Sequence, residues 1–302
     1  MAAVQEPKKT PIGGYVGFDT IPTQIERKLL RRGFAFNVML VGATGLGKST
    51  LLNTLFAAHL IDSKGRFKVN EPPRQTTEIA PVTHHIEENG VRLKLTVIDT
   101  PGYADLMNNE HCLDPILKYI KDQYAHFLRK ELTAARERYI TDTRVHCVLF
   151  FINPSGQSLK PLDIVALRQL ADICNVVPRA AFKARIKEEI EYHGIKLYPG
   201  QLQVPEPLDE YDLQEQALTD AIRARIPFAR GRPSVAAAPS GVGSLRSTTR
   251  TNCEFTHLRN FLTRTHLQDL IETTALHYEA FRTRQLLALK ENRDSSNTSP
   301  NK

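Results

Sequence analysis

Residues 42–49 fit the pattern G-x-x-x-x-G-K-[ST], which is typical of loops that bind nucleotide phosphates. Glycines let backbone N–H groups turn toward phosphate oxygens, and the N-terminus of a following helix adds partial positive charge. Lys48 is expected to reach the outer phosphates, and the Ser49 hydroxyl to ligate Mg²⁺. A chance glycine-rich turn is disfavoured, because the pattern is long and its flanks agree. The predicted nucleotide-binding residues here are Gly42, Ala43, Thr44, Gly45, Leu46, Gly47, Lys48, Ser49 and Thr50.

A second motif, Asp99-Thr100-Pro101-Gly102, follows a predicted strand over residues 91–98. An acidic side chain at the tip of a strand suits a nucleotide-bound Mg²⁺, which it holds directly or through water. Gly102 can bring its N–H close to a terminal phosphate, because glycine allows close approach of backbone to ligand. Alone, the tetrapeptide is compatible with a plain turn. After a phosphate loop, it is better interpreted as the segment that senses the last phosphate.

The polar segment 61–80 is expected to be a mobile loop between these two motifs. A threonine in it, Thr76 or Thr77, is a candidate to complete the Mg²⁺ coordination and to hold the attacking water. Threonines are common in loops, so this hypothesis depends on the position of the segment between the two motifs.

Strands and helices alternate in a way that predicts an α/β fold with a doubly wound, mostly parallel sheet. The apolar run 34–41 predicts a strand before the phosphate loop, and leucines at helical spacing predict a helix after it. Asn89-Gly90 predicts a hairpin turn between strands at 81–88 and 91–98. A buried strand is expected over residues 145–152. Further helices are predicted around residues 113–128, 162–170, 182–192, 208–225 and 258–290, the last being an extra C-terminal helix.

The 302 residues are 41% hydrophobic, which suffices for a sizeable core in one large domain or two small ones. The longest apolar run is far shorter than the roughly 20 residues of a membrane-spanning helix, and no apolar signal core begins the chain. Four cysteines without a C-x-x-C pair favour reduced thiols in a cytosolic protein over disulfides or zinc. The net charge of +7 favours acidic partners: phosphate, nucleic acid or an anionic membrane surface.

A short amphipathic helix is predicted over residues 25–32, with four cations on one face and apolar side chains on the other. Such a helix can lie on anionic lipid headgroups, but an ordinary solvated face or a stem covering the domain fits equally well. Nucleic acid is less favoured, since no aromatic residues interleave the charges. The candidate membrane-binding residues are Arg27, Lys28, Arg31 and Arg32.

The predicted organisation has four regions: a flexible arm (1–24), the basic helix (25–32), a nucleotide-binding domain (33–290) and a disordered polar tail (291–302). Two places break the α/β pattern. At residues 178–182 the fold should finish a strand and present base-reading residues, but the chain runs straight into a charged helix. Residues 229–252 are rich in Ala, Ser, Gly and Arg without periodicity, which is typical of a disordered insert.

Taken together, these motifs resemble those of the septins, filament-forming guanine-nucleotide-binding proteins with a three-layer P-loop GTPase fold. The resemblance covers roughly residues 14–290. Residues 129–134 and the short tail resemble in particular the fungal septins at the centre of the hetero-octameric rod, which lack a C-terminal coiled coil. Besides the phosphate loop, the resemblance rests on residues 14–18 (GYVGF), 95–103 (LTVIDTPGY), 151–156 (FINPSG), 159–163 (LKPLD) and 263–270 (TRTHLQDL).

The resemblance implies bound GTP or GDP with Mg²⁺, the metal ligands being Ser49, Thr76 and Asp99. Thr76 matches the family's catalytic threonine. Tyr103 stands where many fast-switching relatives place a water-orienting Gln, which implies at most slow hydrolysis of GTP to GDP and phosphate. Gln157 replaces a histidine with which many septins reach the neighbouring subunit's nucleotide.

The resemblance also implies partners and a location. The expected partners are other septin subunits, joined into hetero-oligomeric filaments through alternating nucleotide-face and terminal-helix interfaces, and no nucleic acid. Phosphoinositide binding by the family's basic stretch favours the membrane interpretation of residues 25–32. The expected location is cytoplasmic, in the cytoskeleton: the septin ring at the division site (bud neck or septum) and the cell cortex.

Two departures from the family pattern leave other functions open. The guanine-reading Ala-Lys-Ala-Asp segment is absent, and residues 179–185 contain no Asp, so Lys183 is not assigned as a base reader. The Gly-containing strand and Trp-bearing hairpin expected across residues 230–250 are also missing, and the chain has no Trp. Both losses are typical of altered splicing or an error in the gene model. A nucleotide-poor filament scaffold and an unrelated P-loop NTPase therefore remain as alternatives.

Overall fold

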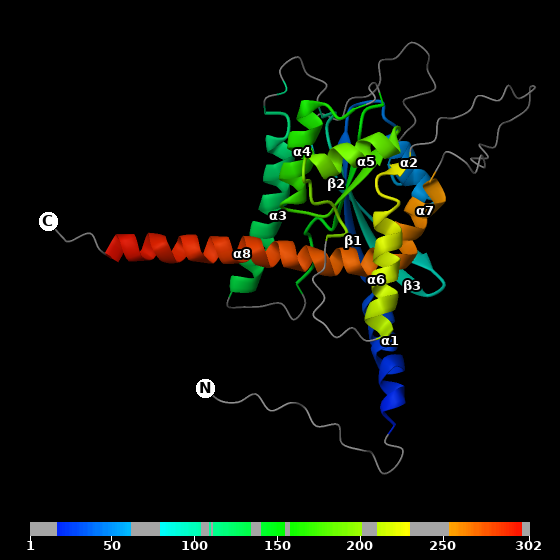
Figure 1. The fold of residues 1–302 in the computed structure, drawn as a ribbon. Helices are drawn as coiled ribbons and strands as arrows, with labels where there is room; N and C mark the ends of the chain where they lie inside the picture. The colour runs from blue at the N-terminus through cyan, green and yellow to red at the C-terminus, as the bar shows by residue number, and fades with distance from the viewer. Residues whose placement is uncertain are drawn as a thin grey trace, which may run out of the picture.

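A six-stranded sheet forms the centre of the computed structural model, which describes residues 17–61, 79–103, 109, 111–133, 140–154, 158–200, 210–229 and 254–297. The strand order is β2-β3-β1-β4-β5-β6; β2 is antiparallel to β3, and the other neighbours are parallel. Helices lie on both faces (Figure 1), which confirms the predicted doubly wound, mostly parallel α/β fold. The strands are β1 (Phe34–Gly42), β2 (Ala80–Glu88), β3 (Val91–Asp99), β4 (Cys147–Phe151), β5 (Val176–Ala180) and β6 (Phe228–Ala229).

The β2–β3 hairpin turns at the two residues that its sequence indicates. Asn89 and Gly90 have φ of 50° and 80°, and Glu88 pairs with Val91 across the turn. Two consecutive positive φ values are what a type I′ turn needs, and its twist matches that of the flanking strands. The hairpin places β3 beside β1, so that the end of β3 lies next to the strand that leads into the phosphate loop.

The sheet is buried on both faces because its central strands are apolar at successive positions. Met39 and Val41 of β1 point into one core cluster, whereas Val38 and Leu40 point into the other. The first cluster contains side chains from α3, α4, α5 and α8, and the second contains side chains from α2, α7 and the start of α8. The helices are α1 (Ile21–Arg32), α2 (Lys48–Leu55), α3 (Asp114–Leu132), α4 (Pro161–Ala171), α5 (Lys183–Tyr192), α6 (Glu210–Arg223), α7 (Phe255–Asn260) and α8 (Leu267–Asn297).

The C-terminal helix is interrupted, so the prediction of one continuous helix over residues 258–290 is wrong. α7 leads into a π-helical turn, Phe261–Thr265, and α8 starts only at Leu267. The turn buries Phe261 and Leu262 in the core, and the His266 N–H donates to the Phe261 carbonyl (3.1 Å). Apolar spacing predicts helix through this region but does not reveal the π turn, because a π turn adds one residue to a single turn and leaves the spacing on either side helical.

Both ends of the described chain are more helical than predicted. A 3₁₀ turn (Phe18–Thr20) and the first four residues of α1 (21–24) occupy residues that were expected to belong to a flexible arm; residues 1–16 lie outside the description. Proline near the start of α1 suits a helix N-terminus, because the first N–H groups have no helical partner. At the other end, α8 continues to Asn297, so the predicted disordered tail is wrong for residues 291–297. No glycine or proline interrupts this segment.

The end of β5 is more regular than predicted. Arg179 pairs with Phe151 of β4 on one side and with Phe228 of β6 on the other. The expected irregularity at 178–182 is therefore wrong for its first three residues, because buried apolar side chains extend the strand to Ala180. Of the expected insert at 229–252, Ala229 belongs to β6 and the remainder lies outside the described residues.

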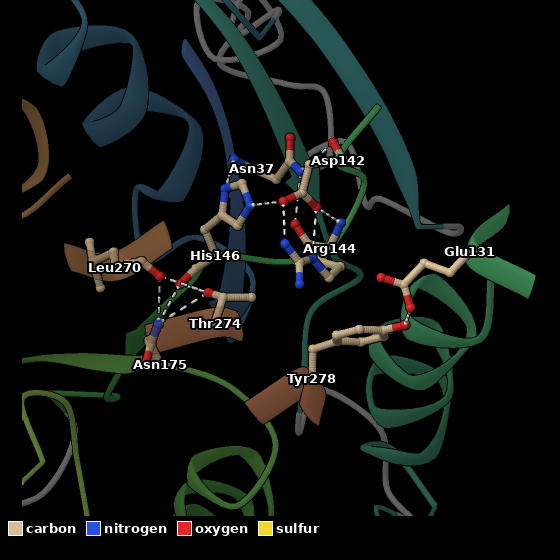
Figure 2. A network of polar contacts seen from close by, with 9 residues as sticks. All are labelled: Asn37, Glu131, Asp142, Arg144, His146, Asn175, Leu270, Thr274 and Tyr278. Carbon is tan, nitrogen blue, oxygen red and sulfur yellow. Dashed lines mark hydrogen bonds and ion pairs between the residues drawn. The ribbon is translucent and has the colours of Figure 1, made fainter. Parts of the chain in front are cut away.

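A network of polar contacts lies where β4 and β5 begin, at the edge of the sheet opposite the phosphate loop (Figure 2). His146 is fully buried; its Nδ1 accepts the Asn37 N–H (3.0 Å), so its proton resides on Nε2, which lies 3.2 Å from the Asp142 carboxylate. That carboxylate also accepts two hydrogen bonds from the Arg144 guanidinium (2.7 and 3.0 Å). The guanidinium in turn stacks on Phe127 of α3, 4.3 Å from the ring centroid.

The same network holds α8 against the sheet. The Asn175 side-chain amide donates to the backbone carbonyls of His146 and Leu270, each at 2.9 Å, and lies 3.2 Å from the Thr274 hydroxyl. Further along α8, the Tyr278 hydroxyl donates to Glu131 of α3 (2.5 Å). The C-terminal part of α8 then projects past α3 (Figure 1).

Candidate nucleotide site

The phosphate loop lies between β1 and α2, in the strand–loop–helix order that the sequence predicts. Gly45 and Gly47 have φ of +81° and +77°, and a Cβ built on either residue would meet nothing within 4 Å. Gly47 caps α2, whose first residue is Lys48. The loop therefore turns its backbone toward open space at the start of a helix. Glycine tolerates this conformation, and a phosphate is suited to it.

The Lys48 side chain folds back over its own loop. Its ammonium donates to the carbonyls of Gly42 (2.8 Å) and Ala43 (3.1 Å), so the positive charge is held at the loop rather than in bulk solvent. Ser49, the second residue of α2, is half-buried one residue further on. The Leu46 side chain packs into the apolar core, so only its backbone is left to face a phosphate.

Gly42 is required by close packing between β1 and β4. It pairs in register with Phe151, and a Cβ at position 42 would lie 2.7 Å from the Phe151 Cβ and 3.0 Å from its carbonyl oxygen. Real Cβ atoms do not approach another carbon as closely as 2.7 Å, so glycine fits where the strand passes into the loop and a larger residue would push β1 and β4 apart.

The structure brings the second motif alongside the loop. Asp99 ends β3 and pairs in register with Leu40, two residues before the loop. The next side chain, Thr100, is buried and donates its hydroxyl proton to the Leu40 carbonyl (2.7 Å). The Tyr103 N–H then donates to the Gly42 carbonyl (3.4 Å). Residues 99–103, including Gly102, thus follow the end of β1 into the loop.

Tyr103 is packed inward from this turn. Its side chain is 3% exposed, and its ring packs edge-on against Phe150 of β4 with a centroid separation of 5.6 Å. The hydroxyl donates to the Asp163 carboxylate of α4 at 2.8 Å. Burial, and then the Asp163 charge, raise the pKa of Tyr103 far above its usual value, so the hydroxyl stays a proton donor.

The candidate metal ligands are described only in part. Ser49 lies in α2, which follows β1, and Asp99 ends β3, which pairs with β1; such oxygen ligands suit Mg²⁺ together with nucleotide oxygens. Thr76 and Thr77 lie outside the described residues, as does Gln157. In the part of the chain that is described, no group of three or more His, Cys, Asp or Glu side chains could hold a metal ion.

Lys183, which follows β5, forms an ion pair within the protein. It is the first residue of α5, and its ammonium lies 2.7 Å from the Glu254 carboxylate, which precedes α7. This ion pair joins two helices that are far apart in sequence. It agrees with leaving Lys183 out of the predicted base-reading residues.

The basic helix α1 projects from the domain body (Figure 1). Ile21, Ile25 and Leu29 are 45%, 53% and 42% exposed, so its apolar face does not cover the core. Its four predicted membrane-binding residues are exposed as well: Arg27, Lys28, Arg31 and Arg32. The interpretation as a stem that covers the domain is therefore not supported.

A parallel sheet that ends in a glycine-rich loop at a helix N-terminus, with an acidic strand tip beside it, defines a P-loop nucleotide-binding protein. A family model described as Septin matches residues 32–295. The chain belongs to the septin family. As such it has a cytoskeletal, GTP-binding role, and neither the unrelated P-loop NTPase nor the nucleotide-poor scaffold is favoured.

Several curated septins resemble the chain over most of its length. Septin homolog spn2 of Schizosaccharomyces pombe is 50% identical over 311 residues, covering 95% of this chain and 92% of its own. Cell division control protein 10 of Candida albicans is 47% identical over 322 residues, covering 98% and 88%. Human neuronal-specific septin-3 is 42% identical, covering 90% and 81%. The first two alignments are longer than the chain, so these relatives have residues without a counterpart here.

A solved structure gives the same picture of the fold. The crystal structure of Cdc11 from Saccharomyces cerevisiae matches with a TM-score of 0.52 and 27% sequence identity, covering 83% of this chain and 99% of that one. None of the helices in the described ranges is both long and apolar enough to cross a membrane.

Two residues of the site region lie in the quoted motifs, but the sequence predicts no role for either. Thr100 and Asp163 fix the second motif to β1 and to α4, respectively. Asp163 carries a local signal, because it lies three residues after Lys160 and caps the start of α4. That signal predicts a helix start, but not the tyrosine from 60 residues upstream that shares the carboxylate.

Proposed function

We propose that the chain binds the phosphates of a guanine nucleotide with Mg²⁺ and holds that nucleotide as a subunit of septin polymers. The geometry of Gly45 and Gly47 carries this proposal: both adopt positive φ over open space at the start of α2. A bound phosphate there receives backbone N–H groups and the partial charge of the helix end. The guanine preference rests on family membership.

Each residue of the site has a proposed task. Lys48 exchanges its carbonyl partners for phosphate oxygens, while Ser49 and Asp99 contribute oxygen ligands to the metal. Gly102 offers its N–H to the terminal phosphate, and Thr76 orients the attacking water. Mg²⁺, when bound, neutralises phosphate charge and fixes the geometry of the phosphate oxygens.

Hydrolysis is proposed to be slow. The side chain that follows Gly102 is Tyr103, which is buried and hydrogen-bonded to Asp163. It is therefore not available to orient a water at the terminal phosphate, a task that a glutamine performs in fast GTPases. A nucleotide that turns over slowly is suited to shaping an assembly surface.

Nucleotide content tests the proposal. Purified protein is denatured, and the released nucleotides are separated by chromatography and counted against protein. We expect close to one guanine nucleotide per chain, single-turnover hydrolysis far below enzyme-like rates, and loss of nucleotide in Lys48→Ala. Lys118→Ala, which removes an exposed ammonium from α3, is the matched control and should retain nucleotide. A folded wild-type protein that binds no nucleotide on exchange would contradict the proposal.

Septins assemble with one another into hetero-oligomeric filaments, so other septin subunits are partners of this chain. The relatives named cell division control protein 10 indicate the cytoskeleton at division sites. We propose in addition that α1 binds anionic phosphoinositide headgroups at the cell cortex. The exposure of its apolar face beside four exposed cations supports this, since an interfacial helix needs both.

Vesicle binding tests the membrane proposal. A variant with Ala at the four basic positions of α1 should bind vesicles containing phosphoinositides more weakly than wild type at physiological salt. A charge-matched control removes four exposed cations from α3 and α8 and should bind like wild type: Lys118, Lys121, Arg284 and Lys290. Equal binding by both variants would exclude α1 as the membrane contact.

A further inference from the structure

Tyr103 is fastened at two points, and this distinguishes it from its neighbours in the turn. Its backbone N–H donates to Gly42, the first residue of the phosphate loop (3.4 Å), and its hydroxyl donates to Asp163 at the start of α4 (2.8 Å). Gly102, directly before it, has no side chain to fix its position. The location of the Gly102 N–H therefore depends on how firmly the next residue is held.

The anchor on α4 is rigid. Asp163 is 5% exposed, and its second carboxylate oxygen accepts the Lys160 N–H (3.3 Å), so both oxygens have partners. One residue earlier, the Leu159 N–H donates to the Glu189 side chain of α5 (2.6 Å). The start of α4 is thus tied to α5, and the carboxylate that receives the Tyr103 hydroxyl has little freedom to move.

We infer that Tyr103 is a positioning residue, whose hydroxyl bond to Asp163 holds the Gly102 N–H in place for the terminal phosphate and so sets the preference for nucleoside triphosphate over diphosphate. The inference rests on the proposed function, because it concerns the same site. A tethered turn loses less conformational freedom when it orders around a ligand, and the gain appears as affinity. Only a triphosphate reaches Gly102, so the diphosphate does not benefit.

The test compares affinities for two nucleotides in three single variants and one double variant of the full chain. Fluorescent GDP and a fluorescent, non-hydrolysable GTP analogue are titrated with Mg²⁺ into nucleotide-free protein. Tyr103→Phe keeps the ring and removes the hydroxyl. Asp163→Asn keeps the shape and removes the charge. The matched control is Tyr124→Phe, which deletes a hydroxyl bond of the same length (2.8 Å, to the Ile173 carbonyl) in the same core cluster, far from the turn in sequence.

The expected result is a triphosphate-to-diphosphate affinity ratio that falls about fivefold to tenfold in Tyr103→Phe, which corresponds to the net contribution of one ordinary hydrogen bond. GDP affinity stays near the wild-type value, and Tyr124→Phe retains the wild-type ratio despite a similar loss of thermal stability. The double variant Tyr103→Phe/Asp163→Asn falls no further than Tyr103→Phe, since Asp163 acts on the turn only through the Tyr103 hydroxyl.

Three outcomes separate failure of the inference from failure of the proposed nucleotide binding. A wild-type ratio in folded Tyr103→Phe overturns the inference and leaves nucleotide binding standing. An equal fall in Tyr124→Phe also overturns it, because the effect then reflects general loosening of the core. Wild-type protein that binds neither nucleotide overturns the proposed function and this inference with it.

Discussion

Asp142→Asn should be among the most destabilising single changes in the described part of the chain. The carboxylate accepts two hydrogen bonds from Arg144 and lies 3.2 Å from the buried His146 ring. The Arg144 side chain is only 11% exposed and the Asp142 side chain 20%. An asparagine in this place presents an NH₂ group to one of these donors and leaves the guanidinium without a counter-charge (Figure 2).

The magnitude follows from the burial. Removing one partner of a fully buried ion pair costs about 3–5 kcal/mol, because the other charge remains desolvated. Here both partners retain some solvent contact, so we expect about 2–4 kcal/mol of unfolding free energy to be lost at pH 7. The exposed pair between Arg223 and Asp220, with side chains 44% and 69% exposed, is the matched comparison. Asp220→Asn should cost less than about 1 kcal/mol.

The loss should depend on pH in a defined direction. Burial alone would raise the pKa of Asp142, but hydrogen bonds from His146 and Arg144, together with the charge of the guanidinium, outweigh it and hold the pKa well below its usual range. The pKa of this carboxyl in the unfolded chain is about 3.9. A carboxylate with a lowered folded pKa stabilises the protein above that value, and this contribution is lost as pH falls toward the folded pKa. The difference between wild type and Asp142→Asn should therefore shrink by about 1.3 kcal/mol between pH 7 and pH 3.

Urea denaturation followed by circular dichroism, at pH steps from 7 to 3, measures both effects. The difference in unfolding free energy between wild type and Asp142→Asn should be large at neutral pH and smaller below pH 4. The corresponding difference for Asp220→Asn should be small throughout. A gap of less than about 1 kcal/mol at pH 7 would refute the claim that this pair is buried and mutually dependent. A large gap that stays constant down to pH 3 would show that the charge of Asp142 is not what stabilises the fold.

Two further predictions concern packing and reactivity. Gly42→Ala should destabilise the protein by roughly 1–3 kcal/mol in urea denaturation, because the new Cβ would lie 2.7 Å from the Phe151 Cβ. A urea midpoint equal to that of wild type would show that β1 and β4 separate easily there. Burial raises the pKa of the Cys147 and Cys174 thiols, so a thiol reagent at pH 8 should modify half-buried Cys112 well before either of them. Mass spectrometry of the native protein measures the order, and modification of Cys147 first would contradict the burial.

Local signals made the phosphate end of the fold predictable. The phosphate loop depends on contiguous residues whose conformations only glycine tolerates, and Asn89-Gly90 determines its turn by the same physics. The alternation of apolar strands and helices sufficed for the parallel sheet, because each central strand is buried on both faces. Boundaries were less accurate: α1 begins earlier, α8 ends later, and the π turn at Phe261–Thr265 leaves no clear trace in apolar spacing.

Polar partners that come from distant parts of the sequence could not be predicted. Asn175 donates to the Leu270 carbonyl, 95 residues away, and the Asn37 N–H donates to His146, 109 residues away. The apolar residues around each asparagine indicate burial but do not identify its partner, because the partner depends on which strands and helices become neighbours. The hydroxyl bond from Tyr103 to Asp163 belongs to the same class, and it is a contact at the candidate site itself.

The central strand limits how the nucleotide could act on the rest of the molecule. β1 runs from one end of the sheet to the other: Asn37 contacts the network that holds α8, and Gly42 opens the phosphate loop. Every residue of β1 from position 36 onward is buried between two packed layers, and close-packed interiors resist bending. A phosphate-dependent change is therefore expected to spread across the carboxyl ends of the strands and not through β1. There, the turn at 99–103 is joined through Tyr103 to α4, and α4 to α5. Removing the Tyr103 hydroxyl oxygen in Tyr103→Phe therefore tests whether a bound triphosphate affects α4 as well as the phosphate loop.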